Sequence, residues 1–296
     1  MSKYRTPLRY PGGKQRLAAF VAEVLECNDA VGWNYVEPYA GGAGVAMELL
    51  LDGKVGRVYL NDSSLHVYAF WKAILSDPER FCRRISRASL TVGTWKKHRE
   101  IVRNPTQHDL TDVGFSAFYL NRCNRSGILT AGVIGGLAQE GKWRMDARFP
   151  RNELVKRVET IAEHKDRITV TNLDAEEFMV VRVNALARDT VVYCDPPYYE
   201  RAERLYLNTY QRDDHVRLAS VIQRKVHRPW LVSYDGHPDI LSLYRKRRKF
   251  RYALKYSAIR AYSAKEVFVF SDDWELPRTS ALSYVAVGLK TLPRSA

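Results

Sequence analysis

The chain has 296 residues, of which 46% are hydrophobic, 27% charged and 11% aromatic. These are the proportions of a globular protein, and they exclude a disordered, collagen-like or coiled-coil chain. The formal net charge is +14, and an excess of this size favours a polyanionic partner such as a nucleic acid.

Membrane insertion, secretion and metal binding are not expected. No stretch approaches the roughly 20 consecutive apolar residues of a membrane span, and no apolar run follows the charged N-terminus as it would in a secretory signal. The cysteines are scattered, and no two have metal-ligand spacing: Cys27, Cys82, Cys123 and Cys194. We therefore expect a cytoplasmic protein with reduced thiols and without a metal or a membrane.

Short runs rich in β-branched and aromatic residues predict strands, and most of them precede a helical pattern. The predicted strands lie at 35–37, 58–60, 168–170, 191–193 and 230–232, with a late hairpin at 252–254 and 267–269. Strands that alternate with helices predict an α/β fold whose mostly parallel sheet is covered on both faces.

Residues 77–166 have helical periodicity and little strand pattern. Leu154, Val155, Val158 and Ile161, for example, share one helical face. We therefore predict a helical lobe at 77–166, inserted into a domain made of residues 1–76 and 167–296.

The strongest local signal is the strand 191–193, which runs into Asp195-Pro196-Pro197-Tyr198. Each proline pushes the residue before it into an extended conformation and lacks a backbone N–H. The turn therefore offers a carboxylate, carbonyl oxygens and an aromatic face. These groups suit a planar amino group, whose two N–H bonds would point at Asp195 and the Pro196 carbonyl. The alternative is a turn with a purely structural role.

A second signal is a glycine-containing turn between the strand that ends at Glu37 and the helical run 45–50. The turn contains Tyr39 and Gly41. Glycines let a ligand approach the backbone, and the helix N-terminus that follows favours an anionic group. Such turns also serve helix–strand packing, so this signal is weak alone.

Two aspartates follow the next predicted strands. Asp62 has the position of the acidic residue that accepts hydrogen bonds from ribose hydroxyls in nucleotide-binding α/β folds. Asp174 closes the third predicted strand and could meet the adenine amino group of a cofactor. Either one could instead cap the helix that follows it. Near the N-terminus, Tyr10 and Lys14 flank a Pro-Gly-Gly turn that could wrap a small ligand.

Taken together and in this order, these segments resemble the Dam-like class of DNA N6-adenine methyltransferases, the D12 family. The segments that carry the resemblance are Arg9-Tyr10-Pro11-Gly12-Gly13-Lys14, Glu37-Pro38-Tyr39-Ala40-Gly41-Gly42, Asn61-Asp62, Phe118-Tyr119-Leu120-Asn121-Arg122 and Asp195-Pro196-Pro197-Tyr198. Two features depart from the family pattern. Ala43 stands where the family often has a glycine, and the segment after Arg122 differs from that of GATC-recognising members.

The resemblance implies a Rossmann-like methyltransferase fold whose helical insertion recognises the target. The implied reaction is site-specific transfer of a methyl group from S-adenosylmethionine to N6 of a flipped adenine in double-stranded DNA. The implied catalytic residues are Asp195, Pro196, Pro197 and Tyr198. The implied cofactor-binding residues are Tyr10, Lys14, Glu37, Tyr39, Gly41, Asp62, Asp174 and Asp195.

DNA contacts are expected within the lobe. Side chains that can make bidentate contacts to purine edges are Asn121, Arg122, Asn124 and Arg125. Two basic runs could meet phosphate or be solvated faces: the cations between Arg80 and Arg103, and the run 245–249. Methylation of RNA or of cytosine N4, and a catalytically idle nucleic-acid-binding protein, remain alternatives.

Overall fold

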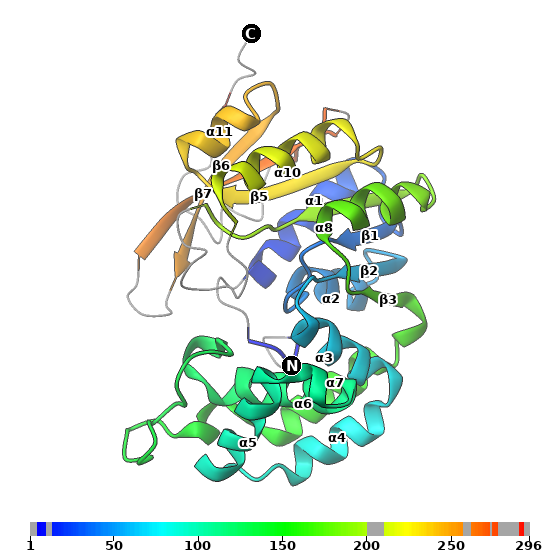
Figure 1. Ribbon diagram of the computed structural model, residues 1–296. Helices are drawn as coiled ribbons and strands as arrows, with labels where there is room; N and C mark the ends of the chain where they lie inside the picture. Colours follow the sequence, from blue (N-terminus) through cyan, green and yellow to red (C-terminus); the bar gives the residue numbers. More distant parts are fainter. Residues whose placement is uncertain are drawn as a thin grey trace. The chain divides into compact units, whose positions relative to one another are not determined.

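The computed structural model describes residues 5–9, 14–199, 210–256, 262–272, 274–277 and 290–292. The chain divides into two units (Figure 1). The helical unit consists of the described parts of residues 1–11 and 62–172, and the sheet unit of the described parts of residues 12–61 and 173–296.

The sheet unit contains the α/β sheet that the sequence predicts. Its described strands have the order β2-β1-β4-β5-β7-β6-β8. Neighbours from β2 to β5 are parallel, and those from β5 onward are antiparallel, so the predicted late hairpin is confirmed as β6 and β7. The strands are β1 (Asn34–Glu37), β2 (Arg57–Asn61), β4 (Thr190–Cys194), β5 (Trp230–Asp235), β6 (Lys249–Tyr256), β7 (Tyr262–Phe270) and β8 (Lys290–Leu292).

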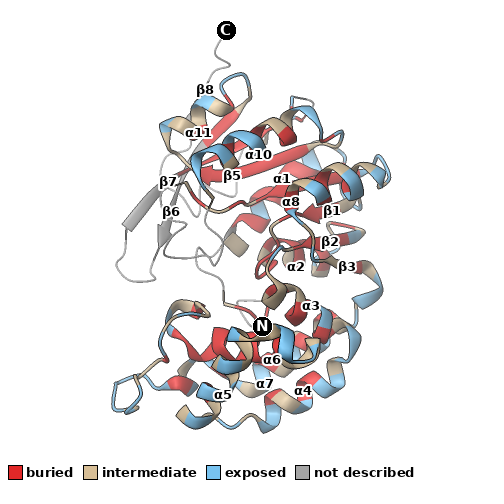
Figure 2. Ribbon diagram, in the orientation of Figure 1, coloured by how far each residue is buried: buried red, intermediate tan, exposed pale blue. Residues whose placement is uncertain are grey.

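Both faces of this sheet are buried, which explains why its strands are apolar at consecutive positions. On one face, Val192 and Val232 pack in a core with residues of α10 and α11. On the other face, Phe268 packs against Phe20 of α1, with ring centroids 4.9 Å apart. Figure 2 shows the buried β5 beside helices whose outer faces are exposed. The helical segments are η1 (Lys14–Leu17), α1 (Ala18–Cys27), α2 (Gly44–Leu51), α8 (Ala175–Glu177), η6 (Phe178–Arg182), η7 (Val183–Ala185), α10 (Arg212–Arg224) and α11 (Pro238–Leu243).

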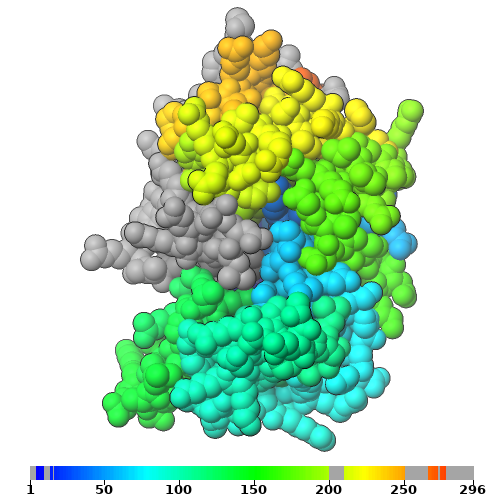
Figure 3. Space-filling view, viewed as in Figure 1, coloured from blue at the N-terminus to red at the C-terminus, as the bar shows by residue number. Residues whose placement is uncertain are grey.

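Three helices of the helical unit begin at a residue that caps them. The side chains of Asp77, Thr91 and Asp109 each accept a hydrogen bond from a backbone N–H in the first turn of α4, α5 and α6. In Figure 3 its cyan-to-green segments form one continuous body. Its elements are α3 (Leu65–Ser76), α4 (Pro78–Arg87), α5 (Val92–Arg103), η2 (Pro105–Gln107), α6 (Leu110–Cys123), η3 (Arg125–Gly127), η4 (Met145–Arg148), α7 (Arg151–Ala162), η5 (Lys165–Arg167) and β3 (Ile168–Thr171).

The helical unit is larger than the predicted lobe of residues 77–166, because α3 and β3 belong to it. A close helix contact explains the place of α3. A Cβ atom at Gly114 of α6 would lie 2.4 Å from the Ala69 carbonyl oxygen of α3, so only glycine permits this approach. Phe70 of α3 also stacks on Phe118 of α6, at 6.0 Å between ring centroids. Among the described residues, no helix is long and apolar enough to cross a membrane.

Candidate functional site

The sheet unit has a topological switch point between β1 and β4. These strands are parallel neighbours, and the chain proceeds from β1 to β2 on one side and from β4 to β5 on the other. In open α/β sheets, ligands bind outside the carboxyl ends of the strands at such a point. Glu37 ends β1 and Asp195 follows β4, so the two predicted carboxylates lie at this edge.

Asp195 is held by two side chains that bind the same oxygen. Lys14 forms an ion pair with Oδ1 of Asp195, and the Ser233 hydroxyl donates to Oδ1 over 3.0 Å. Among the described residues, Oδ2 of Asp195 has no hydrogen-bond partner, and the side chain is 25% exposed. The carboxylate therefore has a fixed orientation, and one of its oxygens has no hydrogen-bond partner among the described residues.

Ser233 is a site residue that the sequence analysis missed. This fully buried serine of β5 contacts the Tyr193 hydroxyl at 2.9 Å and accepts a hydrogen bond from Lys14 at 3.1 Å. It thus links β4, β5 and η1 around Asp195. A polar residue at an otherwise apolar position of a buried strand was the signal, since buried hydroxyls need partners.

Tyr198 is fixed at both ends of its side chain. Its hydroxyl donates to Oε1 of Glu266 in β7 over 3.1 Å, and Lys14 Nζ lies 4.8 Å from its ring centroid. The residue is 5% exposed. Lys14, predicted only as a cofactor ligand, therefore joins Asp195 and Tyr198, the first and last residues of the turn.

Glu37 is buried and bonded to the start of α2. Its Oε1 accepts hydrogen bonds from the Ala46 backbone N–H at 3.0 Å and from the Tyr35 hydroxyl at 3.2 Å. Burial, together with the negative charge of Asp195, raises the pKa of Glu37 to about 8, because desolvation outweighs the effect of these two hydrogen bonds. Near neutral pH this carboxyl group is therefore largely protonated.

The turn between Glu37 and α2 is compact and has left-handed residues. Gly41 has a φ of 48° and Ala43 a φ of 45°, a region in which alanine is strained and glycine is not. The family-pattern departure at Ala43 thus falls where glycine is favoured. Asn61 fixes the same turn, because its side-chain amide donates to the carbonyl oxygens of Pro38 (3.2 Å) and Leu173 (3.0 Å).

The other predicted cofactor residues have local partners or lie outside the described residues. Asp174 caps α8, and its Oδ1 accepts from the backbone N–H groups of Glu176 and Glu177. Asp62, in the helical unit, accepts from the Ser64 backbone N–H at 2.9 Å in the turn before α3. Asp174 therefore has the capping role that was the alternative, whereas Asp62 bonds within the turn that precedes the N-cap Ser64 of α3. Tyr39 contacts the Tyr210 hydroxyl at 3.0 Å, and Tyr10 is not among the described residues.

Asn121 and Arg122 have structural partners in place of the expected exposure to bases. Asn121 is 5% exposed, and its side chain binds both backbone polar groups of Arg9 at 2.7 Å and the Gly127 carbonyl oxygen at 2.9 Å. Arg122 is 6% exposed and donates to the Arg148 carbonyl oxygen at 2.6 Å. Both side chains hold the helical unit together, so the expected base contacts do not fit this geometry.

Asn124 is likewise fully buried and cross-linked. It accepts a hydrogen bond from the Trp95 indole N–H at 2.7 Å and donates to the carbonyl oxygens of Ile128 and Leu129 at 3.0 Å. Its position at the C-terminus of α6 was the available signal, since asparagine side chains often bond to the turn that follows. Of the four predicted base readers, only Arg125 is exposed.

The segment after Arg125 contains two exposed apolar side chains that the sequence analysis did not single out. Leu137 is 63% exposed and Trp143 is 65% exposed. Lys142 lies beside the second of these, with Nζ 6.0 Å from the ring centroid. An exposed aromatic ring beside a cation is typical of nucleic-acid-binding surfaces. Within the described part of the chain, no group of three metal-ligating side chains is present.

The match to known families covers most of the chain. A model of the D12 class N6 adenine-specific DNA methyltransferase family matches residues 10–268. The Retron Ec67 DNA adenine methylase of Escherichia coli is 26% identical over 248 residues, which are 80% of this chain and 76% of the relative. The DNA adenine methylase of Vibrio cholerae is 25% identical over 232 residues, which are 76% of this chain and 78% of the relative.

Two solved structures show a more distant likeness. The rRNA methyltransferase aviRa of Streptomyces viridochromogenes is 14% identical with a TM-score of 0.39, over 90% of this chain and 88% of that chain. A putative RNA methyltransferase of Pyrococcus horikoshii is 11% identical with a TM-score of 0.40, over 89% of this chain and 86% of that chain. At these TM-scores neither supports an inference about the substrate.

Proposed function

Because the chain belongs to the D12 class N6 adenine-specific DNA methyltransferase family, we propose that its methyl donor is S-adenosylmethionine and its substrate an adenine flipped out of double-stranded DNA. One observation carries the proposal: the Asp195 turn lies at the switch point of the sheet, with one carboxylate oxygen held and the other open. A cytoplasmic location is part of the proposal, because the substrate is DNA and the cysteines are unpaired.

The cofactor would lie in the sheet unit along the carboxyl ends of β1 and β4. When bound, it supplies an electrophilic methyl group on a sulfonium. The close turn at Gly41 and the N-terminus of α2 suit the carboxylate of its amino-acid part. Glu37 and Tyr39 flank that turn, and Lys14 lies beside Asp195. Asp174 completes the proposed set within the sheet unit, whereas Asp62 belongs to the helical unit and Tyr10 lies outside the described residues.

Asp195 and Pro196 would orient the target amine. An exocyclic amino group carries two N–H bonds, for which Oδ2 of Asp195 and the Pro196 carbonyl oxygen are the proposed acceptors. Two acceptors draw the nitrogen towards tetrahedral geometry and direct its lone pair to the methyl group. Lys14 and Ser233 prevent Asp195 from rotating. Catalysis by such positioning is worth about 7–11 kcal/mol in favourable cases.

Tyr198 is the proposed stacking partner of the extruded base, and because the residue is only 5% exposed, the base would have to displace the groups that cover its ring. Extrusion costs a few kcal/mol, and stacking on an aromatic ring returns about 1–3 kcal/mol per base. The hydrogen bond from Tyr198 to Glu266 fixes the ring before the base arrives. Pro197 lacks a backbone N–H and restricts Pro196 to an extended conformation, which keeps the carbonyl oxygen free for the amine.

The test is transfer of labelled methyl groups from S-adenosylmethionine to duplex DNA and to RNA of the same sequence. We expect label on N6 of adenine in DNA, and its loss in Asp195→Ala with much of the DNA binding retained. Label on cytosine or RNA would support the alternative substrates. Turnover that survives in Asp195→Ala would refute the assigned role of the carboxylate.

A further inference from the structure

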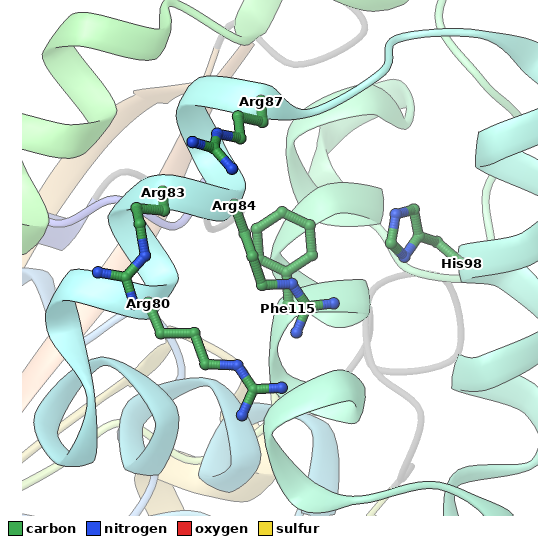
Figure 4. Close-up of a pocket in the computed structure, with 6 residues that line it drawn as sticks. All are labelled: Arg80, Arg83, Arg84, Arg87, His98 and Phe115. Carbon is green, nitrogen blue, oxygen red and sulfur yellow. The ribbon is translucent and has the colours of Figure 1, made fainter.

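A pocket in the helical unit is lined by four arginines. It has a volume of about 400 Å³, and α4 provides Arg80, Arg83, Arg84 and Arg87. His98 of α5 and Phe115 of α6 complete its lining. Figure 4 shows the arginine side chains along α4, with the phenyl and imidazole rings across from them. Among the described lining residues there is no carboxylate.

The four arginines do not have equal structural roles. Arg84 forms an ion pair with Asp112 at 2.8 Å and lies 4.1 Å from the Phe115 ring centroid, so it is part of the packing of α4 on α6. Arg83 has a long contact with Glu79 at 3.7 Å. Within the described residues, the side chains of Arg80 and Arg87 make neither a hydrogen bond nor an ion pair, although Asp109 interacts electrostatically with Arg80.

This spacing is unfavourable for the helix itself. Arg80 and Arg84, like Arg83 and Arg87, stand four residues apart, where like charges destabilise a helix. Burial lowers the pKa of His98 to about 4, so the imidazole adds no charge near neutral pH. Arginines that line a pocket whose described lining has no carboxylate offer donors to the oxygens of a phosphate, which a guanidinium can bind through two parallel hydrogen bonds.

The second basic run, by contrast, has structural partners. Arg247 pairs with Asp272, Arg248 donates to the Asp272 carbonyl oxygen at 2.8 Å, and buried Lys249 donates to the Arg247 carbonyl oxygen at 2.9 Å. These cations stabilise the end of the sheet and are committed there. Arg80 and Arg87 of the pocket, in contrast to these three cations, have side-chain donors without a hydrogen bond or ion pair among the described residues.

We propose that the pocket on α4 is a phosphate-binding site that grips the DNA backbone, with Arg80 and Arg87 as its main donors. The choice of a duplex rests on the proposed function, because the family acts on DNA. A phosphodiester contact is independent of base sequence, so this site contributes affinity and register, and not recognition of the target motif.

The experiment compares salt-dependent binding of a fluorescein-labelled duplex of mixed sequence to three proteins: the wild type, Arg80→Gln/Arg87→Gln, and the control Arg182→Gln/Arg188→Gln. The control removes the same charge from exposed arginines of the sheet unit. The slope of log K against log salt is negative, and each lost phosphate contact reduces its magnitude by about 0.9. We expect the magnitude of the slope to fall by about 2 in the pocket variant, and its binding to be at least about tenfold weaker at 100 mM salt. We expect the control to change the slope by less than half as much.

Replacing single phosphates of the duplex by neutral methylphosphonates identifies the phosphate that the pocket contacts. With a methylphosphonate moved stepwise along the duplex, the wild type should lose affinity at one or two positions where the pocket variant loses nothing further. Equal losses in slope for the two variants would overturn the proposal, and so would no loss in either. The unfolding temperature of the pocket variant should be no lower than that of the wild type, because neither replaced side chain makes a hydrogen bond or ion pair among the described residues and their loss relieves like-charge repulsion along α4.

Two further measurements are made. One distinguishes DNA from free phosphate as the ligand of the pocket, and the other distinguishes the phosphate site from the proposed methyltransferase function. Tripolyphosphate is titrated calorimetrically into the wild type and the pocket variant. Binding that only the wild type shows, together with an unchanged duplex slope, would overturn the assignment to DNA. Methyl transfer by the wild type to the same duplex tests the proposed function alone. An active wild type whose pocket variant keeps the full slope refutes only the phosphate site.

Discussion

The turn after β4 and the C-terminus of α6 both carry polar residues that the sequence marks as functional, yet the structure uses them differently. At the turn, Asp195 keeps one carboxylate oxygen open while Lys14 and Ser233 hold the other. At the end of α6, Asn121 and Asn124 are buried and their amides are bonded to backbone groups. A polar side chain is available to a ligand only where the fold leaves part of its bonding capacity unused.

Asp195→Asn gives the largest expected effect, and it tests whether the Asp195 oxygen that Lys14 and Ser233 leave unbound is used in the reaction. The amide has the same shape, but it offers an N–H group where the carboxylate offers an oxygen. Removing one such polar contact to a reacting group costs about 10²–10³-fold in rate, so we expect at least that loss in the rate of adenine methylation. The measurement is single-turnover methyl transfer to duplex DNA.

The matched control for this prediction is Ser233→Ala. It removes one support of Asp195 and leaves the carboxylate in place, so we expect a smaller loss of rate. A variant Asp195→Asn that methylates as fast as the wild type would show that the open oxygen is not used.

Asn121→Ala tests the buried side of the comparison. It leaves the backbone N–H of Arg9 without its partner, and an unsatisfied buried group costs about 1–3 kcal/mol. We expect the free energy of unfolding to fall by about 2–3 kcal/mol, measured by urea denaturation. Arg125→Ala, at an exposed position of the same segment, should change it by less than about 0.5 kcal/mol. Equal effects of the two variants would contradict the structural role of Asn121.

Glu37→Gln tests whether the buried carboxyl group at the end of β1 is protonated. Its pKa is about 8 in the folded chain against an ordinary value of 4.5. The folded state thus retains a proton that the unfolded chain releases. The stability from this group is fully present below pH 4.5 and is lost as the pH rises to about 8. Relative to the glutamine variant, the wild type should lose up to about 1.4 kcal/mol of unfolding free energy per pH unit.

Urea denaturation at several pH values between 5 and 8 measures this difference. A difference that stays constant across the series would show that Glu37 is ionised throughout. That result would place Glu37 beside Asp195 as a second charged group at the switch point.

Ala43→Gly gives the smallest expected effect and sharpens the picture of the turn before α2. A left-handed alanine costs about 1–2 kcal/mol, and glycine loses about 0.4–1 kcal/mol through the freedom of the unfolded chain. We therefore expect a net stabilisation of about 0.5–1 kcal/mol, measured by thermal unfolding. A destabilised glycine variant would mean that the methyl group of Ala43 has a packing role.

The positions of the strands along the chain were predictable because hydrophobic periodicity and flanking turns are local properties. The predicted strands at 35–37, 191–193 and 230–232 are confirmed within β1, β4 and β5. The boundary of the helical lobe was not predictable in the same way. It depends on Gly114, whose missing side chain lets α6 approach α3, and a single glycine in a helix does not indicate which helix it will meet.

The sequence by itself determined that this chain is an α/β protein with a carboxylate turn at a strand end, because a strand followed by Asp-Pro-Pro-Tyr is local chemistry. Tertiary structure decided which polar groups remain available. Ser233 and Lys14 reach Asp195 from positions 38 residues after it and 181 residues before it in the chain. Asn121 likewise meets Arg9 across 112 residues. Such partners are brought together by the packing of distant elements, and burial then determines which oxygens and amides already have hydrogen-bond partners.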